Sequence, residues 1–220
     1  MRRLLDINNP IIRFLTAVFD LMALSVLWAL FSLPVFTMGA ASAALYSAAY
    51  THVRRGDDYL WASFFNAFKE NFKRSTLCWL VALLVLCLLT GDALILRSLI
   101  LKGYPMGWLY GVTLALLVLA LTWTVYLSAY AARFNGTVKE VLRFSFMLLR
   151  AHPVKMLSVV ALVLGGIAVT LTVPALVIFV PATVYWGASF PIEAVFRKHL
   201  RPEDRERVER EERENDLHNI

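Results

Sequence analysis

Few ionisable side chains lie inside the long apolar stretches of this chain, and they are the first candidates for chemistry. Asp20, Asp92 and Glu193 each stand among apolar residues, and Arg97 follows Asp92 closely. A carboxylate within a bilayer is costly, so such residues commonly belong to ion or proton relays, or pair with a basic residue. None stands at the centre of its apolar stretch, and no series of facing partners extends any of them. We therefore expect local pairing, for Asp20 with Arg13 or a loop arginine, rather than a relay.

Sequence patterns that would indicate catalysis or metal binding are absent. The histidines and cysteines form no H-x-x-x-H, H-E-x-x-H or C-x-x-C pattern. The chain also contains no phosphate-binding loop, no dinucleotide fingerprint and no G-x-S-x-G motif. We expect no enzymatic activity, no cofactor and no metal. The residues concerned are His52, His152, His199, His218, Cys78 and Cys87.

Small residues and prolines carry more information. Gly39 precedes alanines at positions 40, 44 and 48, and Gly107 and Gly111 form a G-x-x-x-G pattern. Such faces let helices approach closely in lipid, either within the chain, which we expect, or against another membrane protein. Pro34 stands five residues before Gly39, and a broken helix there could line a substrate site or form a plain hairpin turn. We expect the turn.

Long stretches without charge indicate that these residues lie in a membrane. Apolar residues make up 59% of the 220 residues and charged residues 17%, against about 25% charged residues in soluble proteins. Residues 21–53 and 156–192 contain no Asp, Glu, Lys or Arg. Each stretch is too long for one spanning helix of roughly 20 residues and close to the length of two. The sequence therefore predicts an all-α, polytopic transmembrane helix bundle.

Six spans are predicted within a transmembrane domain of residues 1–196, followed by a charged cytoplasmic tail of residues 197–220. The second span is the shortest, and its alternative is a half-span or re-entrant helix surrounded by protein. The predicted spans are residues 14–34, 38–53, 75–96, 107–130, 155–173 and 175–195.

The basic residues orient this bundle. Residues 1–196 hold 15 Lys or Arg against 8 Asp or Glu. Most of the basic residues precede the first span or lie in the 54–74 and 131–155 loops, whereas the intervening connections hold only Arg97 and Lys102. Because Lys and Arg collect in cytoplasmic loops, both termini are predicted to be cytoplasmic. The net charge of +6 thus reports membrane orientation, and we expect no nucleic acid partner.

Two of the basic loops are amphipathic. Apolar residues recur at helical spacing in residues 59–74 and again in residues 138–150, opposite Lys, Arg and Glu. Such segments are predicted to lie flat at the membrane interface, the alternative being that each simply begins the next span. Each precedes a pair of apolar segments, so residues 59–130 and 138–196 are either an internal repeat or similar by chance.

A resemblance to a known family rests on two blocks of sequence. Residues 32–46 read SLPVFTMGAASAALY, and residues 64–73 read FFNAFKENFK. With Asn8–Pro10 and Asp20-Leu21, they resemble the YesL-type family of small bacterial integral membrane proteins, a domain of unknown function. Ser25 departs from the asparagine expected there. The resemblance implies a plasma membrane protein of Gram-positive bacteria whose relatives often accompany ABC-type carbohydrate uptake systems, and it transfers no catalytic residue.

The expected function is therefore that of an accessory or regulatory membrane subunit associated with ABC-type carbohydrate uptake. Its expected partners are the lipid bilayer and the subunits of a sugar transporter. The alternatives are a small-molecule transporter or channel in its own right, and a structural or stress-related membrane protein.

Overall fold

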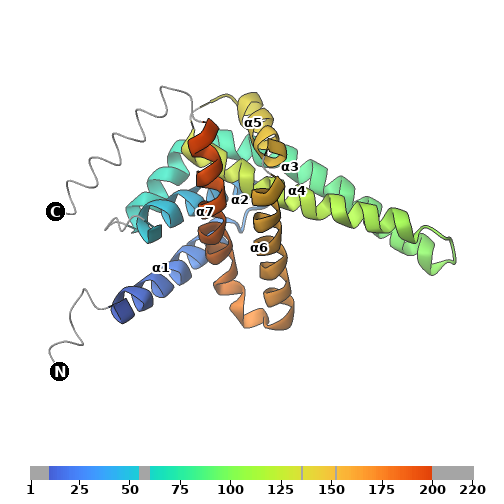
Figure 1. Ribbon diagram of the computed structural model, residues 1–220, viewed down its shortest axis with the longest axis horizontal. Helices are drawn as coiled ribbons and strands as arrows, with labels where there is room; N and C mark the ends of the chain where they lie inside the picture. The colour runs from blue at the N-terminus through green and yellow to red at the C-terminus, as the bar shows by residue number, and fades with distance from the viewer. Residues whose placement is uncertain (1–9, 55–59, 135, 152, 200–220) are drawn as a thin grey trace.

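The computed structural model describes residues 10–54, 60–134, 136–151 and 153–199, and within these ranges the fold is all-α (Figure 1). The predicted charged tail lies outside the described residues from residue 200 onward. The helices are α1 (Pro10–Phe31), α2 (Met38–Ala48), α3 (Leu60–Leu101), α4 (Gly107–Arg133), α5 (Val138–Ala151), α6 (Pro153–Thr172) and α7 (Val180–His199). Short 3₁₀ turns, Val35–Thr37 and Pro174–Ile178, precede α2 and α7.

The first two predicted spans form a hairpin, as Pro34 suggests, but α2 is a short helix enclosed by protein. In the turn, the backbone N–H and Oγ1 of Thr37 both donate to the carbonyl of Pro34, at 2.9 and 2.7 Å. The 11 residues of α2 extend only about 16 Å, and a π-helical turn, Ala49–Arg54, continues them. Residues 39–46 are all buried. The segment is not among the helices long and apolar enough to cross a membrane, and its burial agrees with the enclosed alternative.

Helix α3 joins a predicted interfacial segment to a predicted span. Its 42 residues run from Leu60 to Leu101 without interruption, because no proline or glycine separates residues 59–74 from the apolar residues that follow. The rings of Phe64 and Phe68 pack against Phe31 of α1, with centroids 5.8 and 5.0 Å apart. The prediction of a separate interfacial helix over residues 59–74 is therefore wrong, since this face meets α1.

Helix α5, by contrast, is a separate amphipathic helix. A reciprocal capping box begins it: the backbone N–H of Thr137 donates to Glu140 Oε2 at 2.9 Å, and the N–H of Glu140 to Thr137 Oγ1 at 3.4 Å. These two bonds satisfy N–H groups that a helix start otherwise leaves without partners. The buried face of α5 comprises Val141, Ser145, Leu148 and Leu149. A single residue separates α5 from α6.

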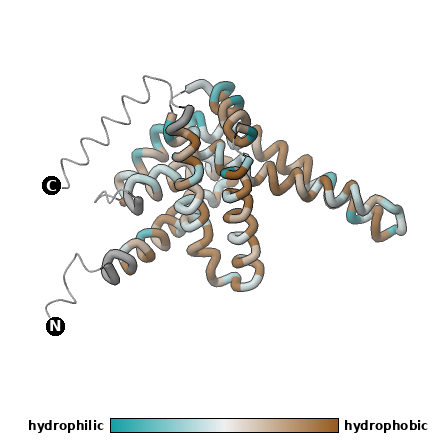
Figure 2. The backbone as a smooth tube through the Cα atoms, viewed as in Figure 1, coloured by the Kyte–Doolittle hydropathy of each residue, from teal (hydrophilic) through white to brown (hydrophobic). Residues whose placement is uncertain are grey.

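Three helices in the described part of the chain are long and apolar enough to cross a membrane: α3, α4 and α6. The structure thus supports a membrane protein but offers fewer spanning helices than the six predicted. Helix α1 has 22 residues, of which Leu15–Phe31 form one of the shorter apolar helices. Helix α7 is not among the three. Figure 2 shows that apolar residues dominate the α3–α4 and α6–α7 hairpins, while hydrophilic residues gather around α5.

The α3–α4 hairpin projects away from the other helices (Figure 1). Between residues 84 and 119, only Ala93, Leu96 and Thr113 are buried. The turn after α1 contacts α3 near its middle, where Trp79 Nε1 donates a hydrogen bond to the carbonyl of Val35 at 2.8 Å. Residue 79 lies about 33 Å along the helix from the end of α3, so the core occupies one end of α3 only.

Candidate functional site

The core forms where α2 crosses α3, and Gly39 makes this approach possible. A Cβ atom at position 39 would lie 2.3 Å from Trp79 Cβ and 2.6 Å from the carbonyl oxygen of Ser75. Neither distance is tolerable, so only glycine allows the two helices to be this close. Gly39 therefore lies at the close contact of α2 with α3.

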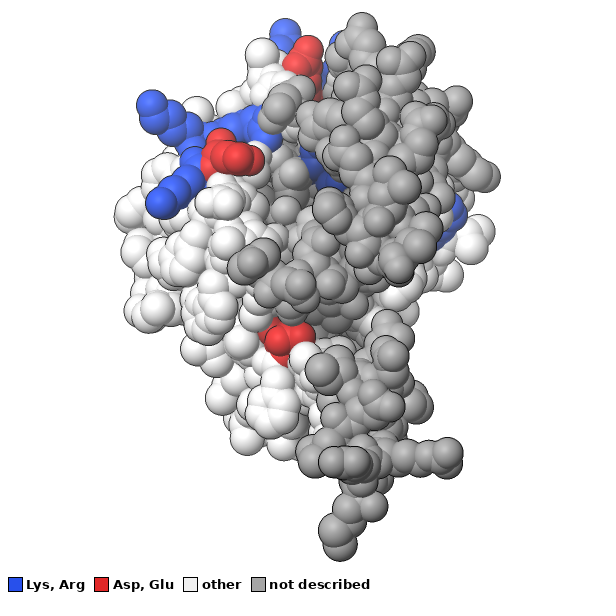
Figure 3. All heavy atoms as spheres, turned by 90° about the vertical axis from the view of Figure 1, so that its left-hand side faces the viewer, with Lys and Arg blue, Asp and Glu red and all other residues white. Residues whose placement is uncertain are grey.

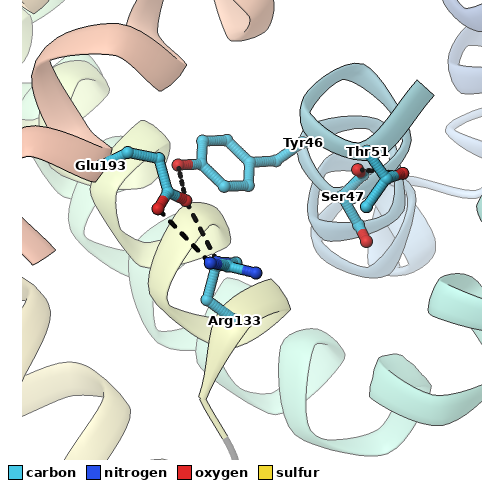
Figure 4. Close-up of polar contacts among 5 residues, drawn as sticks. All are labelled: Tyr46, Ser47, Thr51, Arg133 and Glu193. Atoms are coloured by element: carbon cyan, nitrogen blue, oxygen red, sulfur yellow. Dashed lines mark hydrogen bonds and ion pairs between the residues drawn. The ribbon is translucent and has the colours of Figure 1, made fainter. Parts of the chain in front are cut away.

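A buried ionic network connects α2, α4 and α7 in this core (Figure 4). Arg133 Nε lies 3.1 Å from Glu193 Oε1, and Arg133 Nη2 donates to Oε2 at 3.5 Å. Tyr46 Oη donates to Glu193 Oε1 at 3.0 Å. The guanidinium carbon of Arg133 also stands 4.5 Å from the ring centroid of Tyr50, a cation–π distance. We call Tyr46, Tyr50, Arg133 and Glu193 the Glu193 network.

The network is largely shielded from solvent. The side chains of Arg133 and Glu193 are 13% and 5% exposed, and Tyr46 is fully buried. Removing both charges from water is costly, so the pair is tolerable only because each partner is multiply bonded. Glu193 Oε1 already contacts both Tyr46 and Arg133 and so is not available to bind a substrate. The role of the network is to hold three helices in one arrangement.

The last turn of α4 is a natural place for this arginine. The carbonyl groups that end a helix lack partners within it and carry a partial negative charge. Arg74 of α3 donates to one of them, the carbonyl of Ala131, at 2.6 Å, and it also bonds Asn71 Oδ1. Two arginines therefore gather at the end of α4, one from α3 and one from α4 itself.

Polar residues at four-residue spacing lead to the network along two helices. In α2 and the turn that follows, they are Ser42, Tyr46 and Tyr50; in α7, they are Tyr185, Ser189 and Glu193, and all six are buried. Trp28 Nε1 donates to Ser42 Oγ at 3.0 Å, and Ser128 Oγ bonds Tyr185 Oη at 3.1 Å. Both stripes face the core, so the interior of this bundle is held by hydroxyl groups as well as apolar contacts.

The start of α7 is fixed by a residue that departs from the expected family pattern. Ser25 Oγ on α1 accepts a hydrogen bond from the backbone N–H of Ala182 at 3.1 Å. Ala182 lies in the first turn of α7, where N–H groups have no partner within the helix. Ser25 therefore caps α7 from another helix.

The remaining predicted residues lie apart from the network. Asp20 is half-buried on α1, and the side chain of its predicted partner Arg13 lies outside those described. Pro34 is exposed in the turn after α1. Asp92 is exposed on α3 and accepts a hydrogen bond from Thr113 Oγ1 of α4 at 2.9 Å.

The two glycines of the G-x-x-x-G pattern do not mediate packing within the described chain. A Cβ atom at Gly107 or Gly111 would meet nothing within 4 Å. The prediction of internal packing there is wrong for this reason. Gly166 is the α6 residue that approaches α7 closely, 2.9 Å from Val184 Cγ2 by the same measure.

Sequence reasoning identified Glu193 but missed its partners. Arg133 counts as a loop charge when the fourth span is drawn to residue 130, whereas the helix continues to Arg133. Tyr46 is the last residue of the block 32–46 that carries the family resemblance, and no ionisable residue is nearby in sequence. The sequence did contain one indication of the pair: Glu193 and Arg133 are isolated charges, each at the end of an apolar segment.

No group of three His, Cys, Asp or Glu side chains that could hold a metal ion occurs among the described residues. Cys78 is buried and Cys87 is exposed, and neither is in a disulfide.

Comparison with known proteins gives one family match. Residues 21–93 match the family described as "Protein of unknown function, DUF624". The matched part, about a third of the chain, contains Gly39 and Tyr46 and ends within α3. No curated protein and no solved structure matches the chain.

Proposed function

We propose that this chain is a non-catalytic subunit of a plasma membrane complex and that it assists carbohydrate uptake by an ABC-type transporter. The YesL-type resemblance supports the choice of transport system. The projecting α3–α4 hairpin supports the role of a subunit, because it offers a surface that the rest of the described chain leaves uncovered.

The observation that carries the proposal is the open space around three glycines of this hairpin. Gly91, Gly107 and Gly111 all lie where an added Cβ would meet nothing within 4 Å. Glycines in a membrane helix allow another helix to approach closely, and at Gly39 this chain uses that property internally. On the hairpin the same residue type is left available for a helix from another protein.

Asp92 lies on the same hairpin and supports the same conclusion. Its carboxylate is exposed, next to Gly91 and between the exposed side chains of Leu88 and Leu94. Exposure of a carboxylate to lipid is unfavourable, and the bond from Thr113 satisfies only part of its capacity. A partner helix with a polar or basic residue would remove this exposure.

The alternative of a sugar transporter is less well supported by the interior. A groove of about 340 Å³ lies between α4 and the α6–α7 hairpin, with Trp28 of α1 beside it. Its polar lining groups are already bonded: Thr124 to the carbonyl of Leu121, Thr170 to that of Gly166, and Tyr185 to Ser128. A sugar needs several hydrogen-bond partners, so this groove suits an apolar occupant.

The test is a pull-down with glycine variants in native membranes. Gly111→Leu should block helix approach at the hairpin, whereas Gly165→Leu on α6, also without neighbours within 4 Å, is the matched control. We expect the wild type and Gly165→Leu to recover a sugar-transporter component and to restore uptake across a sugar panel in a deletion strain. Recovery by Gly111→Leu at the wild-type level, or no recovery by the wild type under conditions that preserve known complexes, would refute the proposal.

The proposed orientation places both termini in the cytoplasm, supported by the basic loops. It requires that α7, which returns beside α6 (Figure 1), crosses the membrane in addition to α3, α4 and α6. Single cysteines introduced into the 54–74 and 97–106 loops, in a background with Cys78 and Cys87 replaced, distinguish the two sides. Only a cysteine in the 97–106 loop should react with an impermeant reagent added from outside. Labelling in the 54–74 loop would reverse the orientation.

A further inference from the structure

Helix α5 carries a mixed basic and apolar stripe on its exposed side. The residues lie on one side of the helix, at positions 139, 143, 146, 147 and 150, and all of them are exposed. Arg150 also lies over the ring of Phe146, with its guanidinium carbon 6.0 Å from the centroid. We call this set the α5 stripe: Lys139, Arg143, Phe146, Met147 and Arg150.

The stripe is held outward by the opposite face of α5. That face is buried against the bundle, and Trp123 Nε1 of α4 donates to Ser145 Oγ at 3.0 Å. Turning the stripe inward would break this bond and expose Leu148 and Leu149. The orientation of the three cations is therefore fixed by the fold.

The cations of the stripe outnumber the acidic residues of their own helix. Glu140 is the only acidic residue of α5, and its Oε2 accepts the N–H of Thr137 in the capping box, so α5 carries three cations against one carboxylate. Figure 3 shows basic side chains, with acidic ones among them, at the upper end of the adjacent face, the end at which α5 lies in Figure 1. This end of the molecule therefore attracts an anionic partner.

The position of α5 identifies what kind of anionic partner this is. The helix ends at Ala151, and α6, one of the three helices able to span a membrane, begins at Pro153. The first turns of α6 expose Val154 and Leu157, at 81% and 64%. The stripe thus lies at the level where the apolar span begins. A lipid headgroup region accommodates Phe146 and Met147 together with the basic residues, which a purely aqueous polyanion does not.

We infer that the α5 stripe binds the anionic phospholipid headgroups of the leaflet in which α6 begins. Lys139, Arg143 and Arg150 would contact the phosphate groups, while Phe146 and Met147 would enter the boundary between headgroups and acyl chains. Of the apolar face predicted from sequence to meet lipid, Val141 and Leu149 pack on protein instead, whereas Phe146 is exposed and belongs to the stripe. The inference is independent of the proposed transporter partner.

The test is site-specific quenching in vesicles of phosphatidylcholine. A bimane probe at Met147→Cys, in full-length protein carrying Cys87→Ser, reports lipids next to the stripe, since Cys78 is buried. Doxyl-labelled phosphatidylglycerol should quench it more strongly than doxyl-labelled phosphatidylcholine. A probe at Leu101→Cys, exposed beside Lys102 at the far end of α3, controls for exposed cations in general and should show a much smaller preference.

Charge variants then decide whether the stripe is responsible. Each neutralised cation near a membrane surface should weaken binding of the anionic lipid roughly five-fold, so the triple variant Lys139→Gln/Arg143→Gln/Arg150→Gln should abolish the preference. Arg143→Lys/Arg150→Lys should retain it, and added salt should reduce it. Because these side chains are exposed, thermal unfolding should be unchanged, which excludes misfolding. Equal quenching by both lipids, or an undiminished preference in the triple variant, overturns the inference.

Discussion

Removal of Glu193 should destabilise the protein more than the loss of any exposed carboxylate. In Glu193→Ala, Arg133 would keep its charge at 13% exposure and lose its ionic partner, while Tyr46 would lose the acceptor 3.0 Å away. Breaking a buried pair by deleting one partner costs about 3–5 kcal/mol. Tyr46→Phe removes a single hydrogen bond to a charged acceptor, for which we expect about 1.5–3 kcal/mol.

The informative comparison is with the double variant Arg133→Met/Glu193→Leu. Apolar replacement of both partners leaves no unpaired buried charge and is often neutral or stabilising. We therefore expect the double variant to be more stable than Glu193→Ala by about 3 kcal/mol. With the single variants Arg133→Met and Glu193→Leu the double variant completes a double-mutant cycle, in which strong non-additivity is the signature of a direct pair.

Reversible unfolding in mixed micelles, followed by tryptophan fluorescence, measures these free energies. Asp92→Ala is the control, because its carboxylate is also hydrogen-bonded across helices but is exposed, and its loss should cost less than about 1 kcal/mol. Two results would show that the Glu193 network does not stabilise the core. One is that Glu193→Ala is no more destabilising than Asp92→Ala, and the other is that the effects in the double variant simply add.

Two further predictions concern helix packing and capping, and unfolding under the same conditions tests both. Gly39→Ala should lower the free energy of unfolding by about 3 kcal/mol, because its Cβ would overlap Trp79. Gly165→Ala has open space around it and should stabilise α6 by roughly 1 kcal/mol. Equal effects of the two changes would contradict the close approach of α2 to α3. Ser25→Ala should cost about 1 kcal/mol by leaving the N–H of Ala182 without its acceptor, and Ser25→Thr should restore part of the loss; a neutral Ser25→Ala would mean that this N–H finds another partner.

The sequence predicted the helices that are set by local chemistry. The fourth and fifth predicted spans, residues 107–130 and 155–173, agree with α4 and α6 to within three residues at each end, because turns and prolines border them. The hairpin turn at Pro34 and the interruption at Pro174 followed from the same signals. The separate α5 was predictable from its amphipathic pattern and its Thr137–Glu140 capping box.

What the sequence could not provide are properties of the assembled bundle. Hydropathy describes the second segment as a short span, yet whether such a segment crosses lipid or is enclosed depends on its neighbours. Gly39 and Gly111 are both glycines among apolar residues, but only Gly39 has another helix against it. Arg133 and Glu193 are 60 positions apart, so their pairing depends on how α4 and α7 pack.

The separation of the Glu193 network along the chain has a consequence for biogenesis. Tyr46 precedes Glu193 by 147 positions, so α2 and α4 leave the ribosome well before the carboxylate that joins them exists. Until α7 is inserted, Arg133 has no Glu193 to pair with, and the enclosed helix α2 lacks one of the walls around it. A chain truncated before residue 193 would therefore retain the helices able to span the bilayer and still lack the last part of its core. Closure of the core therefore waits for the last helix to be made, and pairing of Glu193 with Arg133 and Tyr46 is a late event in assembly.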